Sequence, residues 1–156
     1  FNKGAGLLPQ IVPSLLSAGF QVVVQDSGNL MQGESGGNLT LLGYVEDIVS
    51  EIEKCDLVVV PYDPATYRSQ GSSIVWEAIA CGVPVVVPLN SAPGKFAISC
   101  GGGIGFAKFD AAELCNTVFA AAENYRPISE GAFHASKNWA ASNGAGRYAD
   151  ALLSCA

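Results

Sequence analysis

Four short apolar runs, three of them rich in β-branched residues, constrain the fold of this chain more than any other feature. They occupy residues 20–25, 39–42, 56–61 and 83–88, and segments with apolar residues at helical spacing lie between them. Runs of this kind are typical of strands buried in a parallel sheet. Strands that alternate with helices pair in parallel through right-handed crossovers. The sequence therefore predicts an α/β fold, a three-layer Rossmann-like domain with a parallel sheet.

The connecting segments predict the remaining elements. Residues 4–18 have a helical pattern in which Pro13 implies a kink or a late start. Gly71, Ser72 and Ser73 supply an N-cap for a helix that ends at Gly82. The other expected helices are 46–54, 110–124 with Asp110 as its cap, 129–139 and 145–155. Residues 26–37 and 90–103 are expected to be loops, and 104–107 a short edge strand.

Composition bounds the possible functions. The 156 residues suit one domain, 1–156, and 49% apolar with 14% charged residues suits a packed core. A net charge of −6 with scattered basic residues argues against a nucleic-acid partner. Five widely spaced cysteines without a CxxC pair, and a single histidine, His134, predict no metal site and reduced thiols in a cytoplasmic protein. No apolar run reaches the ~18 residues of a membrane span.

The stretch from Tyr62 to Pro84 carries the main functional clue. Between Ser69 and Gly94 the only charged side chain is Glu77. A carboxylate in such apolar surroundings is costly to bury without a partner. A ligand hydroxyl is one candidate partner, and a salt bridge to Lys95 or another cation is the alternative.

In parallel α/β sheets, ligands bind at the carboxyl ends of the strands. This rule places the loops that follow residues 25, 42, 61 and 88 on one rim, together with the start of the helix that begins near Gly71. A helix N-terminus favours an anion, and Arg68 just before it would complete a diphosphate site. The alternatives are that Arg68 is a solvated charge paired with Asp63, and that Ser72 and Ser73 only cap the helix.

Three segments extend this hypothesis to a family. They are Gly43-Tyr-Val-Glu-Asp, Cys55-Asp-Leu-Val-Val-Val-Pro and, the most specific, Trp76-Glu-Ala-Ile-Ala-Cys-Gly-Val-Pro-Val-Val. Together they resemble the C-terminal donor-binding domain of GT-B-fold glycosyltransferases. More narrowly, they are similar to the retaining group 1 transferases related to glycogen synthase and mannosyltransferases. The resemblance runs from about Lys3 to the final helix.

The resemblance implies a nucleotide-diphosphate-sugar donor on the rim, with no separate cofactor and no metal. Glu77 matches a glutamate that holds the ribose, and Lys3 matches a lysine that contacts the donor phosphates. Arg68 is the third expected catalytic residue, because its charge would stabilise the departing diphosphate. The expected substrate-binding residues are Tyr44 and Val45 beside the base, and Tyr67, Ser69, Gln70, Gly71, Ser72 and Ser73 around the phosphates and sugar. At Ser69 the chain departs from the family, whose paired-glutamate motif has an acid there.

The chain opens Phe1-Asn-Lys-Gly without an initiator methionine. We therefore expect a piece of a longer protein, with the first strand of this domain and an acceptor-binding domain upstream. The expected function is transfer of a sugar, as in a hexosyltransferase, from the donor to a sugar or glycan acceptor with retention, and the piece alone would be inactive. Two alternatives are a nucleotide-sugar epimerase-like enzyme on the same fold and a non-catalytic nucleotide-binding or assembly module.

Overall fold

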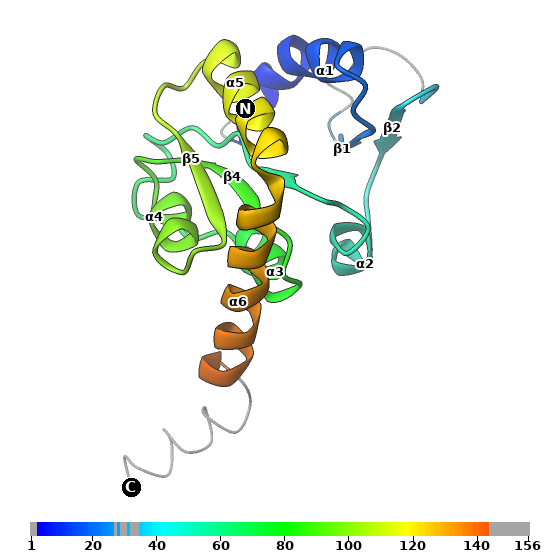
Figure 1. Cartoon of the computed structure of the whole chain (residues 1–156). Coiled ribbons are helices and arrows are strands. Elements are labelled where there is room, and N and C mark those ends of the chain that lie inside the picture. The colour runs from blue at the N-terminus through cyan, green and yellow to red at the C-terminus, as the bar shows by residue number, and fades with distance from the viewer. Residues whose placement is uncertain (1–2, 27, 29–30, 32–34, 144–156) are drawn as a thin grey trace, which may run out of the picture.

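Helices and parallel strands alternate along the chain in the computed structural model, which describes residues 3–26, 28, 31 and 35–143. Figure 1 shows helices on both sides of the central strands. The elements in chain order are a 3-10 turn η1 (Ala5–Leu7), α1 (Leu8–Ser17), β1 (Val22–Gln25), β2 (Leu39–Leu42), α2 (Ile48–Ile52), β3 (Val58–Val59), α3 (Ser73–Ala80), β4 (Val85–Pro88), α4 (Ala92–Ser99), β5 (Gly103–Phe106), α5 (Ala111–Glu123) and α6 (Tyr125–Asn143).

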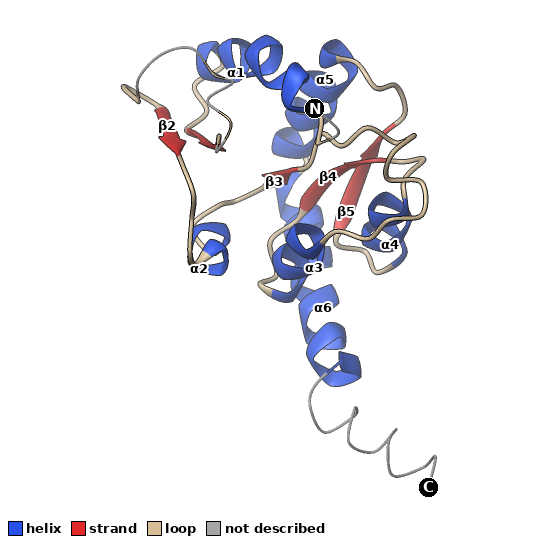
Figure 2. Ribbon diagram, turned by 180° about the vertical axis from the view of Figure 1, so that it is seen from behind, coloured by secondary structure: helices blue, strands red, loops and turns tan. Residues whose placement is uncertain are grey.

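Every strand pair within these sheets is parallel, as the sequence predicts. β1 pairs with β2 from Val22 opposite Leu39, whereas β3, β4 and β5 form a second sheet in that order. β5 lies at the end of its sheet, so the expected edge strand is confirmed. The sequence predicts one parallel sheet, but the described ladders form two, which stand apart in Figure 2.

The three-layer arrangement is visible in the alternating side chains of β4. Val85 and Val87 face a core shared with α3 and Ala97 of α4, whereas Val86 faces a core shared with α1 and α5. All three valines are fully buried. Because successive side chains of a strand point to opposite faces, two separate cores on one strand mean that helices cover both faces. The α/β fold with parallel strands is therefore confirmed.

One segment differs from the sequence prediction. Residues 90–103 are expected to be a loop, but most of them form α4. The hydroxyl of Ser91 accepts a hydrogen bond from the Gly94 amide at 3.0 Å, which makes Ser91 the N-cap. The Pro93-Gly94 dipeptide suggests a turn, yet proline is well suited to the first turn of a helix. The expected helix over 145–155 lies outside the described residues.

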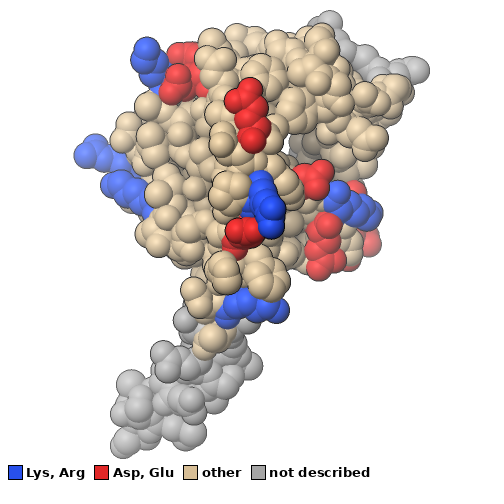
Figure 3. All heavy atoms as spheres, viewed as in Figure 1, with Lys and Arg blue, Asp and Glu red and all other residues tan. Residues whose placement is uncertain are grey.

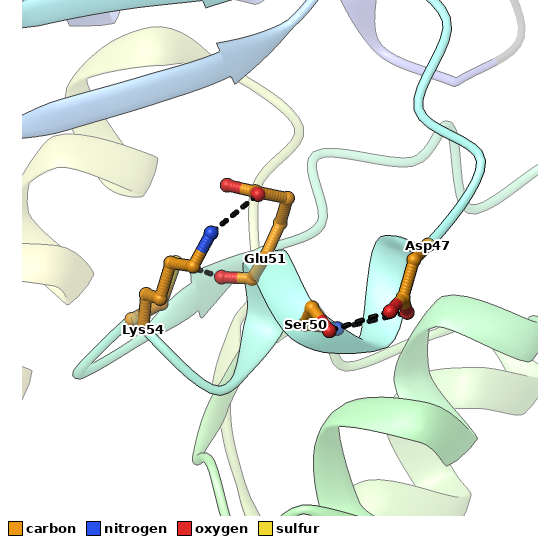
Figure 4. A network of polar contacts seen from close by, with 5 residues as sticks. Asp47, Ser50, Glu51 and Lys54 are labelled. Atoms are coloured by element: carbon orange, nitrogen blue, oxygen red, sulfur yellow. Dashed lines mark hydrogen bonds and ion pairs between the residues drawn. The ribbon is translucent and has the colours of Figure 1, made fainter.

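The short helix α2 depends on its cap. Asp47 accepts hydrogen bonds from both the amide and the hydroxyl of Ser50, and Lys54 forms an ion pair with Glu51 at 2.6 Å (Figure 4). The hydrogen bonds from Ser50 lower the pKa of the Asp47 carboxyl. The Asp47 side chain thus gives a backbone amide in the first turn a hydrogen-bond partner, in a helix that has only five residues.

Candidate functional site

Gly4 brings the start of the chain against the carboxyl end of β3. Its φ is 70°, and a Cβ atom built on it would lie 1.4 Å from the carbonyl oxygen of Pro61. Only glycine fits such a contact, because the backbones of the two residues touch and the conformation is left-handed. Lys3, which precedes it and is exposed, is therefore held beside the loop that follows Pro61.

The rim loop, defined as residues 62–72, begins with a turn built by Asp63. The Asp63 carboxylate accepts hydrogen bonds from the Ala65 amide at 2.9 Å and the Thr66 hydroxyl at 3.2 Å. The backbone carbonyl of Asp63 accepts a hydrogen bond from the Tyr67 amide at 3.0 Å. Within the described residues Asp63 forms no ion pair with Arg68, so this carboxylate shapes the loop and the Arg68 side chain is exposed to solvent.

Two stacked tyrosines join the rim loop to α3. The rings of Tyr62 and Tyr67 are both buried and lie 4.0 Å apart between centroids, at 22°. The Ser72 hydroxyl donates to the Tyr62 hydroxyl at 3.2 Å and accepts from the Val75 amide at 3.4 Å. The expected cap of α3 is thus confirmed, and a buried tyrosine fixes its position relative to β3.

The first turn of α3 offers backbone donors. The Val75 amide is capped by Ser72, and the Trp76 amide bonds to the Ser72 carbonyl. Across the described chain the amides of Ser73 and Ile74 have no protein acceptor. Free amides at a helix N-terminus bind anions such as phosphate. The exposed side chains of Arg68, Ser69 and Gln70 lie on the loop that leads into this turn, and Ser73 is exposed on the turn itself.

Gly71 has a steric role in this loop. A Cβ atom on Gly71 would lie 2.8 Å from the Trp76 ring. The indole therefore packs over the glycine and leaves little room for a side chain there. Trp76 is still 43% exposed, and its ring meets Phe96 edge-on at 6.5 Å between centroids. The ring thus forms part of the surface next to the loop.

Glu77 is half-buried and has one carboxylate oxygen that is both buried and unpaired. Its Oε2 atom is shielded from solvent and has no hydrogen-bond partner in the described part of the chain. No salt bridge to Lys95 forms there, so the structural alternative for Glu77 is not realised among the described residues. Glu77 follows Ser73 by four residues, and this spacing puts both on one helix face.

Lys3 and Tyr67 lie close enough to interact electrostatically. Burial raises the pKa of the Tyr67 hydroxyl, the neighbouring Tyr62 adds to the rise, and the positive charge of Lys3 opposes it. The structure therefore brings Lys3 from the chain start to the rim loop. Tyr67 itself is buried in the stack, so it packs beneath the loop surface.

Tyr44 and Val45 lie apart from these contacts. They belong to the segment between β2 and α2, where Tyr44 is 84% exposed. No hydrogen bond or ring contact joins either residue to the rim loop in the part of the chain that the structure describes. Their expected place beside a base remains a prediction.

The residue pattern does not reveal that Tyr62, Trp76 and Gly4 are parts of the site. A tyrosine directly after a buried strand is a weak signal, and the Tyr62 contact to Ser72 spans ten residues. The close approach of Gly4 to Pro61 joins segments that are distant in the sequence. Nothing in the local residue pattern reports such contacts.

The charges around the site are few. Figure 3 shows charged side chains scattered over one face, with large uncharged areas between them. Among the described residues, no three or more His, Cys, Asp or Glu side chains gather as a metal site would require, and no helix has the length and apolar character needed to cross a membrane. The local positive charge on the rim comes from Lys3 and Arg68 together with the α3 amides.

A parallel, three-layer α/β domain with an anion-suited helix N-terminus at its rim defines a Rossmann-like class. Comparison with known protein families narrows this class further. Residues 2–124 match the family described as glycosyl transferases group 1, and the chain belongs to that family. Its fold is similar to that of a solved glycotransferase of kitacinnamycin, with a TM-score of 0.65 and 18% identity. That similarity covers 96% of this chain and 38% of the solved one. No curated protein sequence matches the chain.

Proposed function

We propose that this chain binds a nucleotide-diphosphate sugar at the rim loop and the start of α3, as the donor half of a retaining, hexosyltransferase-type enzyme. The observation that supports it most is the buried, unpaired Oε2 atom of Glu77. Burying an acceptor without a donor is unfavourable by roughly 1–3 kcal/mol or more for a charged group. The hydroxyls of a bound ribose would supply that donor.

The remaining groups suit the diphosphate. In the proposed reaction the bond from the sugar C1 to the diphosphate oxygen breaks, and the diphosphate leaves with the electron pair. Lys3, Arg68 and the amides of Ser73 and Ile74 would stabilise the negative charge that develops. The acceptor hydroxyl oxygen then bonds to C1 on the face that the diphosphate left, and its proton passes to solvent.

The acceptor would be a sugar or glycan held by a part of the enzyme outside this chain. This chain spans 38% of the length of the related glycotransferase, so the acceptor contacts are proposed to lie elsewhere. We expect the chain alone to bind the donor and to turn none over.

Titration calorimetry with UDP, GDP and ADP tests donor binding. We expect one of the three to bind at about millimolar concentration or tighter. Arg68→Ala should weaken it by roughly tenfold, the effect of losing one charge-assisted hydrogen bond. Arg126→Ala is the matched control, because Arg126 is exposed on α6 and pairs there with Glu130. Failure of all three nucleotides to bind a folded sample at millimolar concentration would refute the proposal.

The role of Glu77 can be isolated by removing the ribose hydroxyls. Glu77→Gln should weaken the binding of whichever nucleotide binds by roughly tenfold, because a charged hydrogen-bond acceptor is lost. The same substitution should leave the affinity for the 2′,3′-dideoxy form of that nucleotide unchanged, because the dideoxy ribose has no hydroxyl at these positions to donate. An equal loss of affinity for both nucleotides would show that Glu77 acts through the fold and not through the ribose.

A non-catalytic nucleotide-binding module is the second candidate. It is favoured by Ser69, an exposed hydroxyl at the position where the resembled family has an acid. A longer protein that contains this chain separates the two candidates. Sugar transfer that is lost in Arg68→Ala supports the transferase, whereas nucleotide binding without transfer supports the module.

A further inference from the structure

The start of α3 has two different sides. Figure 2 shows α2 and α4 on opposite sides of α3, and both helices pack against it. Glu77 lies on the α2 side, as its effect on Cys81 indicates. Burial raises the pKa of the Cys81 thiol, and the negative charges of Glu53, at the end of α2, and of Glu77 add to the rise. Glu77 therefore acts on the same thiol as a residue of the α2 end.

Trp76 lies on the α4 side. Its ring meets that of Phe96 in α4 edge-on, at 6.5 Å between centroids and 84° between the ring planes. Successive residues of a helix are turned about 100° from each other, so Trp76 and Glu77 point in different directions. Helical side chains also lean toward the N-terminus of the helix. The indole accordingly reaches back over Gly71, where a built Cβ atom would lie 2.8 Å from the ring.

The rim loop is tied to the same side. The backbone carbonyl of Tyr67 accepts a hydrogen bond from the amide of Ala92, the first residue of α4, at 2.9 Å. The exposed residues Ser69 and Gln70 follow Tyr67 within three positions. In the described part of the chain the indole N–H of Trp76 has no acceptor, so it is free to donate to a ligand. The α4 side of the α3 start thus combines an aromatic ring with uncharged polar groups.

This combination suits a sugar. A pyranose presents C–H groups that pack on an aromatic ring, and hydroxyls that form hydrogen bonds with hydroxyl, amide and indole N–H groups. Ligand sites commonly pair aromatic walls with a few polar groups in this way. Trp76 is 43% exposed beside the loop that carries Ser69 and Gln70, so both kinds of group are accessible there.

The order of the groups around α3 gives the direction of the donor. With a ribose on Glu77 and a diphosphate on the amides of Ser73 and Ile74, the far end of the diphosphate extends to the α4 side. We propose that Trp76 is a specificity-determining residue whose indole contacts the transferred sugar, and that this sugar is a pyranose. The inference rests on the proposed donor site and adds to it the residue that recognises the sugar.

Titration calorimetry can separate the sugar from the rest of the donor. UDP, GDP and ADP first identify the diphosphate that binds, and its glucose, galactose and mannose esters are then compared with it. We expect at least one ester to bind at least about fivefold more tightly than the diphosphate, because it buries part of an aromatic side chain. Trp76→Leu should remove most of this gain and change the affinity for the diphosphate by less than about twofold. Trp76→Phe, which keeps a ring, should retain part of the gain.

Phe133→Leu is the matched control, because it also removes an exposed aromatic ring beside α3. Phe133 is 54% exposed on α6. It lies near the C-terminal end of α3, where a Cβ atom built on Gly82 would be 3.7 Å from the Phe133 Cα atom. Phe133→Leu should therefore change neither the affinity for the diphosphate nor the gain from the sugar.

Several results would overturn the inference while leaving the diphosphate site in place. No ester could bind more tightly than the diphosphate, or the gain could survive in Trp76→Leu or be lost equally in Phe133→Leu. Trp76→Leu could also weaken the diphosphate and its esters equally, which would show that the indole supports the start of α3 and not the sugar. A folded chain that binds none of the three diphosphates would instead refute the proposed function, and this inference with it.

Discussion

At the scale of single residues, Gly4 has the most demanding position in the described chain. Gly4→Ala would place a methyl group 1.4 Å from the Pro61 carbonyl oxygen, at a φ of 70° that L residues rarely adopt. The chain start must then leave β3, and we expect the free energy of unfolding to fall by at least about 2 kcal/mol. Urea denaturation measures this change.

The neighbouring Gly6 gives a matched control. A Cβ atom on Gly6 would have no atom within 4 Å, and its φ is not in the left-handed region. Gly6→Ala should therefore change stability by no more than about 0.5 kcal/mol. Equal effects of the two substitutions would contradict the role given to the Gly4–Pro61 contact.

Residue-scale signals in the sequence identify part of the site. Ser72 as the α3 cap follows from local residue types, and Glu77 stands out because its neighbours are uncharged. The support that Tyr62 gives to Ser72 could not be foreseen, because a hydroxyl pair across a loop depends on the tertiary path of the chain. The same holds for Tyr67, which is buried in a core cluster and stacks on Tyr62.

At the scale of elements, α4 depends on a single buried hydroxyl. The Ser91 hydroxyl donates to the Pro88 carbonyl at 2.7 Å and accepts from the Gly94 amide at 3.0 Å, with no exposure to solvent. Ser91→Ala removes the cap and one donor to the end of β4. We expect a loss of about 2 kcal/mol in the free energy of unfolding.

Ser99 in the same helix is the control for this substitution. Its hydroxyl donates to the Phe96 carbonyl at 2.8 Å, but the residue is exposed, so water can replace the bond. Ser99→Ala should therefore cost less than about 0.5 kcal/mol by chemical denaturation. A loss at Ser91 no larger than at Ser99 would show that α4 does not need its cap.

Elements with strong local patterns were predictable. The sequence predicts β2 at residues 39–42 and the Asp110 cap of α5, and the structure has both. β3 is shorter than the 56–61 run that predicts it, because its ladder with β4 joins only Val58 and Val59. α4 was missed because Pro93-Gly94 reads locally as a turn, while its cap bonds to the backbone of β4.

At the scale of the whole molecule, acidic side chains with raised pKa values link stability to alkaline pH. Burial is the main cause that raises the pKa values of three thiols and two phenols, namely Cys55, Cys81, Cys115, Tyr67 and Tyr125. These groups are neutral when protonated, so the folded state holds their protons more tightly than the unfolded chain. Their contribution is complete below the unfolded pKa values and is lost as pH rises through the folded ones.

We therefore expect the free energy of unfolding to stay level from pH 7 to about 8 and to fall above the ordinary thiol pKa of about 8.5. Each thiol and Tyr67 adds at most about 1.4 kcal/mol per pH unit to the slope, and the exposed Tyr125 adds less because solvent screens it. Cys115→Ala should make the fall less steep, because that buried thiol no longer titrates. Urea unfolding with a reductant present, at intervals from pH 7 to about 10.5, measures both slopes. A level profile over the whole range, or equal slopes for the two proteins, would show that these thiols and phenols do not control alkaline stability.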